Sequence, residues 1–179
     1  MKYKGDTLIK TICLLVYYLF AQYLPQSGRI FNIGGLLRRY LCQKIFLKCG
    51  EKVNIERKAY FGNGANICIG SYSGIGVNAI IPNDTIIGDY VMMGPNCYIL
   101  SQNHAFDRVD IPMGLQGFTE TKRTIIEDDC WIGRDVLMTP GRHISQGSII
   151  AARCCLTKDF PPFSVVGGNP SKFIKQRNI

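Results

Sequence analysis

The sequence predicts a mainly β protein, built as a triangular parallel β-helix, or prism, of about five coils, with a helical segment before it and one protruding loop. Three observations predict this fold. Aliphatic residues recur every six positions, small residues hold a second fixed place in the same repeat, and the repeat is interrupted once. With 179 residues, 46% hydrophobic and 19% charged, the chain is long enough for one domain with a sizeable core.

A six-residue period runs through most of the chain after residue 53. A period of six fits neither a helix, which repeats every 3.6 residues, nor a hairpin strand, which repeats every two. A short strand and a tight turn, repeated three times per coil, do explain it, with the aliphatic side chain pointing inward. The aliphatic positions are Ile69, Ile75, Ile81, Ile87, Met93 and Ile99, then Ile126, Ile132, Met138, Ile144, Ile150 and Leu156.

Small residues complete the repeat. Glycine often follows the aliphatic residue, where we expect it to supply the unusual backbone angles of the turns. The glycines at this place are Gly70, Gly76, Gly88, Gly94 and Gly133. Three cysteines, Cys97, Cys130 and Cys154, fall on a small inward position, so we expect them to be buried apolar residues, as in a reducing compartment. Eight cysteines without a C-x-x-C pair exclude a disulfide scaffold and disfavour a zinc ribbon.

The interruption lies between Ile99 and Ile126, a spacing of 27 residues that is not a multiple of six. We therefore expect residues 100–124 to leave the prism as a loop, the usual place for function on a regular scaffold. His104 stands at the start of this loop, with Asp107 three residues later and Asn96 before it. An imidazole can accept a proton near neutral pH, so His104 is either a general base or a polar loop residue.

The basic residues are concentrated at the N-terminus. Residues 1–52 hold nine basic and two acidic residues, so they carry +7 of the net +8, while residues 53–179 are nearly neutral. We therefore divide the chain into a basic, apolar helical segment (1–52) and the prism with its loop (53–179). Nucleic-acid binding is disfavoured because no basic stripe crosses the body.

The N-terminal segment contains two predicted helices. The unbroken apolar run 12–21 has ten residues, half of what a membrane-spanning helix needs. Residues 33–49 show helical spacing, with Gly50 as the expected terminator. Two roles are compatible with this pattern: a cap over the open end of the prism, and an interfacial helix attracted to anionic lipid.

Four motifs point to a known family. They are Gly94-Pro95-Asn96 followed by His104, Asp129-Cys130-Trp131-Ile132-Gly133, Thr157-Lys158-Asp159 followed by Pro161, and the segment from Val166 to Lys172. In these motifs the sequence resembles the hexapeptide-repeat acyltransferases, most closely the bacterial surface-polysaccharide O-acetyltransferases of the maltose/galactoside O-acetyltransferase-like group. The resemblance implies a left-handed β-helix, a homotrimer with active sites between prisms, and acetyl-CoA as acyl donor without a metal.

The resemblance also implies roles for individual residues. His104 becomes the catalytic base, and the substrate-binding residues are Asn96, Asp107 and Trp131. The residues expected along the acetyl-CoA groove are Arg134, Ala152, Thr157, Lys158, Lys172 and Lys175. The chain departs from the family pattern at Arg153, which replaces a glycine beside this groove. It also carries Arg142 at an inward position, where we expect the guanidinium to turn outward or to pair with an acid.

The function implied is acetylation of a sugar hydroxyl in surface polysaccharide biosynthesis, with a saccharide or lipid-linked sugar as acceptor. We expect the protein in the cytoplasm, with residues 1–52 in peripheral contact with the inner face of the membrane. An amino-sugar N-acetyltransferase and a non-catalytic β-helix scaffold remain alternatives. A carbonic anhydrase of the same fold, which binds zinc through three histidines, is excluded because the chain has two.

Overall fold

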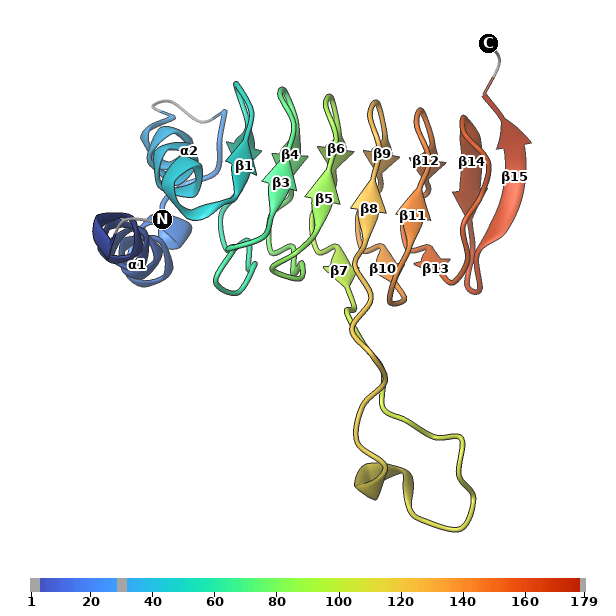
Figure 1. Cartoon of the computed structure of the whole chain (residues 1–179). Coiled ribbons are helices and arrows are strands. Elements are labelled where there is room, and N and C mark those ends of the chain that lie inside the picture. Colours follow the sequence, from blue (N-terminus) through green and yellow to red (C-terminus); the bar gives the residue numbers. More distant parts are fainter. Residues whose placement is uncertain (1–3, 29–31, 178–179) are drawn as a thin grey trace.

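The protein is described by a computed structural model that covers residues 4–28 and 32–177. Figure 1 shows a row of stacked coils that forms a prism, two helices at the end nearest the N-terminus, and a long loop that leaves one corner. The helical segments are α1 (Lys4–Leu19), η1 (Ala21–Tyr23), α2 (Ile33–Ile45) and, within the loop, η2 (Met113–Leu115). The predicted mainly β class and prism are confirmed.

Short strands line the three faces of the prism, and all pair in parallel except the last two. The first face holds β1 (Lys48–Cys49), β3 (Cys68–Ile69), β5 (Ile86–Ile87), β8 (Ile125–Ile126) and β11 (His143–Ile144). The second face holds β2 (Asn54–Ile55), β4 (Gly74–Ile75), β6 (Met92–Met93), β9 (Trp131–Ile132), β12 (Ile149–Ile150), β14 (Ser164–Gly167) and β15 (Lys172–Gln176). The third face holds β7 (Tyr98–Ile99), β10 (Leu137–Met138) and β13 (Cys155–Leu156), extended by bridges from Tyr60 to Ile80 and from Ile80 to Tyr98.

The core is a set of aliphatic columns. On the first face, Ile69, Ile87, Ile126 and Ile144 occupy the same register in successive coils. Eleven of the twelve predicted aliphatic positions are buried, and the twelfth, Met93, is half-buried against them. Burying one such side chain stabilises the fold by about 1.5–3 kcal/mol, so the columns are the main source of stability.

The expected reason for the repeated glycines is wrong. The left-handed backbone angles at the corners belong mostly to other residues, such as Tyr72, Asn78 and Asp135, and not to the glycines that follow the aliphatic residues. Those glycines lie where neighbouring coils touch: a Cβ on Gly76 would stand 2.0 Å from the carbonyl oxygen of Gly94. A missing side chain is therefore required by close approach of the backbones.

The inward cysteines behave as predicted. Cys97, Cys130 and Cys154 are buried, and burial raises the pKa of each thiol to about 11. The neighbouring Cys155 faces outward from β13 and is half-buried. Arg142 pairs with an acid, as expected: its Nη1 lies 3.4 Å from Asp159 Oδ1.

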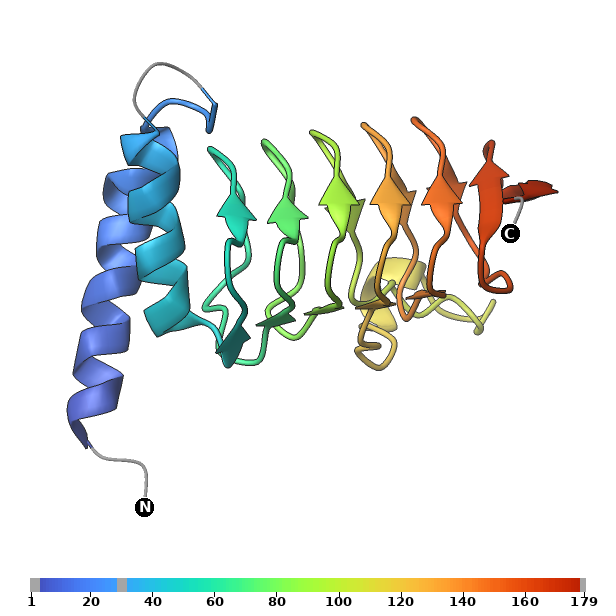
Figure 2. The same cartoon turned by 90° about the horizontal axis from the view of Figure 1, so that it is seen from above.

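The two helices cover the open end of the first coil (Figure 2). Tyr17 of α1 is fully buried and donates a hydrogen bond of 2.8 Å to the carbonyl oxygen of Ala59. The second helix is shorter than predicted and ends at Ile45, because the Leu47 amide already bonds to Ile67 in the next coil and residues 48–49 form β1. The prism thus begins before residue 53. No helix within residues 4–28 and 32–177 is long and apolar enough to cross a membrane.

A buried arginine joins these helices to the prism. The Arg38 side chain of α2 has no exposed surface and donates hydrogen bonds to the carbonyl oxygens of Ala21, Leu24, Pro25 and Ile55. Its Nη2 also lies 3.8 Å from Glu56 Oε2. Desolvation lowers the pKa of Arg38, and these acceptors, together with Glu56, compensate the buried charge.

We predict that Arg38→Ala lowers the free energy of unfolding by about 3 kcal/mol, because it leaves several buried carbonyl groups without a donor. Urea denaturation followed by circular dichroism measures the change. Lys44→Ala is the matched control, since Lys44 is an exposed cation of the same helix and should change stability by less than about 0.5 kcal/mol. Equal effects of the two substitutions would contradict the role assigned to Arg38.

Candidate functional site

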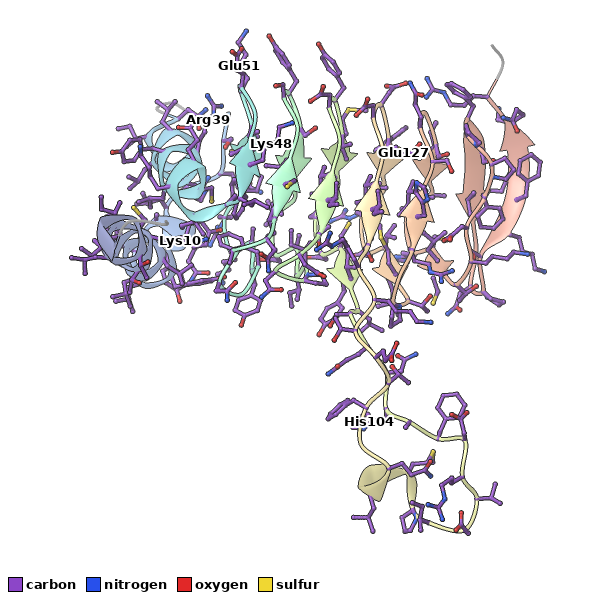
Figure 3. All side chains as sticks on the ribbon, in the orientation of Figure 1. Lys10, Arg39, Lys48, Glu51, His104 and Glu127 are labelled. Atoms are coloured by element: carbon purple, nitrogen blue, oxygen red, sulfur yellow. The ribbon has the colours of Figure 1, made fainter. Side chains whose placement is uncertain are left out.

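The loop carrying His104 leaves the corner between the third and first faces, which we call the third corner. Its two arms pair as a stem: the Ala105 amide bonds to the Gly117 carbonyl at 3.0 Å, and the Thr119 amide bonds to the Asn103 carbonyl at 2.8 Å. Gly117 has a φ of 79°, which favours glycine where the chain turns back. The stem holds His104 away from the prism wall, as Figure 3 shows.

His104 is exposed and rests on an aromatic ring. The imidazole and the Phe118 ring have centroids 4.4 Å apart, and the two residues pair across the stem. Beside them lies an open cavity of about 480 Å³ between the stem and the third face. Its aromatic lining residues are Tyr60, Tyr98 and Phe118, and its polar ones include Gln102 and Asn103. An imidazole at the rim of such a cavity can meet a bound hydroxyl group.

The Asp107 carboxylate is also exposed, but it does not orient the imidazole. Within the described residues no hydrogen bond joins it to His104. The end of the loop is held instead by Gln116, whose Oε1 accepts a bond of 3.1 Å from the Arg108 amide. A partner for His104 must therefore come from a bound molecule or from another chain.

A second group of predicted residues lies at the corner between the second and third faces, which we call the second corner. Asn96 has a φ of 60° and takes part in a ladder: its Nδ2 donates to Asp135 Oδ1 at 2.8 Å, and its Oδ1 accepts from Asn78 Nδ2 at 3.0 Å. Arg134 lies at the same corner, with its Nε 3.8 Å from Asp135 Oδ2.

The second corner carries a positive charge. The Nε atom of Arg153 also lies 3.8 Å from Asp135 Oδ2, so two guanidinium groups share one carboxylate. Their side chains are 63% and 85% exposed. One positive charge is left without a partner at this corner, where it can attract an anionic group such as a phosphate. Ala152, exposed beside them, adds no bulk.

The remaining predicted residues lie on other parts of the prism. Trp131 points outward from β9, half exposed, on the second face. Thr157 lies at the third corner, where its Oγ1 is 3.1 Å from Ser171 Oγ, and Lys158 stands 5.5 Å from the Phe160 ring. Lys172 and Lys175 are exposed on β15, which shares a sheet with Trp131.

One chain therefore separates the predicted site into parts. Asn96, Arg134 and Ala152 share the second corner, whereas His104 and Asp107 project from the third corner. Neither Asn96 nor Trp131 lines the cavity beside His104.

Sequence reasoning did not assign a role to Phe118, Asn78, Asp135 or Arg153. For three of these a signal existed. Asn78 stands 18 residues before Asn96, and Arg153 stands 18 after Asp135, which is one coil in each case. Stepping by whole coils from a predicted site residue finds its neighbours at the same corner. Nothing in the repeat marks Phe118, because the loop does not follow it.

A family model described as the GLGC left-handed parallel beta-helix domain matches residues 50–167, more than half of the chain. The galactoside O-acetyltransferase of Escherichia coli (strain K12) is 32% identical over 143 residues, which cover 79% of this chain and 69% of that enzyme. The chain belongs to the hexapeptide-repeat acyltransferase family. Membership confirms the predicted left-handed β-helix and identifies the chain as an acyltransferase.

Solved structures share the fold. A maltose O-acetyltransferase from Clostridium difficile 630 is 26% identical, with a TM-score of 0.70 over 99% of this chain and 90% of that one. A hexapeptide-repeat acetyltransferase from Vibrio cholerae O1 biovar eltor, complexed with acetyl coenzyme A, is 24% identical, with a TM-score of 0.77 over 98% and 90% of the two chains. The chain spans about two thirds of the length of the galactoside O-acetyltransferases it matches.

We predict that Asn96→Ala lowers the free energy of unfolding by about 2 kcal/mol and Asn96→Gly by about 1 kcal/mol, measured by urea denaturation. Both variants lose the side-chain ladder, but only alanine pays for the left-handed backbone angle. Equal losses would mean that the angle is not a constraint at this corner, and no loss in either would mean that the ladder does not stabilise the fold.

Proposed function

We propose that the protein transfers the acetyl group of acetyl-CoA to a hydroxyl group of a sugar, with His104 as general base. The observation that carries the proposal is the position of His104 on the loop stem, at the rim of a cavity of about 480 Å³ with aromatic walls. Aromatic rings with polar groups at the rim suit a sugar ring, which has apolar faces and a polar edge. The relatives named above act on galactosides and maltose, which supports the same acceptor class.

The reaction is a direct transfer. The imidazole of His104 takes the proton of the acceptor hydroxyl while the hydroxyl oxygen attacks the carbonyl carbon of the thioester. The tetrahedral intermediate then collapses, the carbon–sulfur bond breaks, and the imidazolium returns its proton to the departing thiolate. The products are an acetyl ester and free CoA. Phe118 supports this chemistry by holding the imidazole against the stem.

The exposed cations of the prism fit the proposed donor. CoA carries several phosphate groups, and guanidinium and ammonium groups are their usual partners. Arg134 and Arg153 supply the unmatched positive charge of the second corner, and Lys158, Lys172 and Lys175 supply further exposed charges. We propose that the pantetheine arm passes the small, exposed Ala152 and that Thr157 contacts the same ligand.

We propose that the active protein is a homotrimer. Support comes from the separation of His104 from Asn96 and Trp131 within one chain. A neighbouring copy that brings its second corner and second face to the loop would complete the acceptor site. Asn96, Asp107 and Trp131 would then contact the sugar beside His104.

We also propose the cellular setting. The acceptor belongs to surface polysaccharide biosynthesis, as a saccharide or a lipid-linked sugar, and the reaction takes place in the cytoplasm, where acetyl-CoA is available. Residues 1–52 bring the enzyme to the inner face of the membrane. Support comes from their +7 charge and their apolar helices.

We predict that His104→Ala lowers kcat by about 10² or more, while the Kd for acetyl-CoA changes less than about twofold, because the base touches the acceptor and not the donor phosphates. Release of free CoA thiol, measured across simple sugars and amino sugars, gives the rates. His143→Ala is the matched control and should keep full activity, because His143 is paired with Glu127 on the first face.

The acceptor panel separates the alternatives. Ester formation with a sugar hydroxyl supports the proposal, whereas amide formation with an amino sugar alone would replace it with an N-acetyltransferase. No thiol release with any acceptor would indicate a non-catalytic scaffold. A His104→Ala variant with unchanged turnover would contradict the mechanism.

A further inference from the structure

The outermost surface of the helical cap is aliphatic. Leu8, Ile12, Leu15 and Leu19 follow one another at helical spacing on α1, and their exposed fractions lie between 51% and 77%. They lie opposite Cys13 and Tyr17, which face the core. Helix α1 is therefore apolar on both sides, and its outward side is not matched by any contact of the kind that buries its inward side.

The second helix adds a parallel stripe. Ile33, Leu36 and Tyr40 are each more than half exposed and lie opposite the buried Arg38, Leu41 and Ile45. Because both helices cover the same end of the prism, both stripes face away from it (Figure 2). We call these seven outward residues of α1 and α2 the outer stripe.

A surface helix of a water-soluble domain normally carries polar residues on its outward side. Contiguous exposed aliphatic residues mark a surface that something else covers. Within residues 4–28 and 32–177 no element of the chain lies over the outer stripe, and the helices form the end of the molecule (Figures 1 and 2). The covering partner therefore lies outside the described chain.

The charge around the outer stripe indicates the chemistry of this partner. The sequence from residue 7 to residue 50 contains six basic residues and no acidic one. Lys44 lies beside the stripe, with its Nζ 5.9 Å from the centre of the Tyr40 ring. A second copy would bring one cationic surface against another. An anionic surface matches the charge, and its apolar layer matches the aliphatic side chains.

The length of α1 fixes how it can meet such a layer. A helix of 16 residues is about 24 Å long, too short to span a bilayer of about 30 Å. A helix that instead lies flat buries its apolar side in the boundary between headgroups and acyl chains. We propose that the outer stripe is a docking surface for an anionic lipid bilayer, with α1 parallel to the membrane plane and the prism standing away from it.

This orientation has a consequence for the proposed acceptor. The His104 loop leaves between β7 and β8, and β8 lies three strand spacings from β1, or about 15 Å along the prism. A sugar carried on a lipid in the same membrane would approach the loop from the side of the helical cap. This consequence rests on the proposed function, whereas the lipid contact itself does not.

The test uses the full chain and vesicles, without any acetylation reaction. Purified protein is sedimented with vesicles of phosphatidylglycerol and phosphatidylcholine in equal parts, and separately with vesicles of phosphatidylcholine alone. The test variant is Leu15→Ser/Leu19→Ser, in the outer stripe. The matched control is Leu115→Ser on the loop, because Leu115 and Leu19 are both 77% exposed.

We expect the wild-type chain and the Leu115→Ser control to sediment with the anionic vesicles and not with the neutral ones. The double variant should bind the anionic vesicles at least about tenfold more weakly, with an unchanged thermal unfolding curve, because both side chains point away from the core. Equal binding by the double variant, or no wild-type binding to anionic vesicles, would overturn the proposal. It would also be overturned if the double substitution changed only the oligomeric state, measured by light scattering, since a second copy would then cover the stripe.

Discussion

The stacking of inward aliphatic side chains from coil to coil constrains everything else in this protein. Ile69, Ile87, Ile126 and Ile144 lie in one column, and each can be buried only if every coil repeats the path of the one before it. That requirement brings the backbones so close that a Cβ on Gly76 would meet Gly94 at 2.0 Å. It also leaves the first coil with an open apolar end, which α1 and α2 cover and Arg38 secures.

Function is placed where the repeat is free to vary. Side chains at the corners and in the loop do not enter the core, so they can carry charge and chemistry without cost to the columns. The second corner uses this freedom for two arginines around Asp135, and the third corner uses it for the loop with His104. Because these corners are held apart by the third face, a rigid prism cannot bring them together by itself. A split site is the consequence of a scaffold with no hinge between its coils.

Much of the fold could be predicted from the sequence, because the period of six directly reports which side chains are inside. The loop was located by the same period, since 27 residues cannot fit whole repeats. The end of α2 was misplaced because helical spacing continues to Lys48 while the Leu47 amide is already bonded to the next coil. The packing of Phe118 on His104 could not be predicted, since it depends on which residues pair across the stem.

The central claim is that each site takes His104 from one chain and Trp131 from its neighbour. Chains with His104→Ala and chains with Trp131→Ala, each nearly inactive alone, are mixed in equal amounts after denaturation and refolded together. If sites form between chains of a trimer, about a quarter of them regain both residues, and the mixture recovers about a quarter of wild-type activity. A mixture no more active than the two variants separately would contradict the shared site.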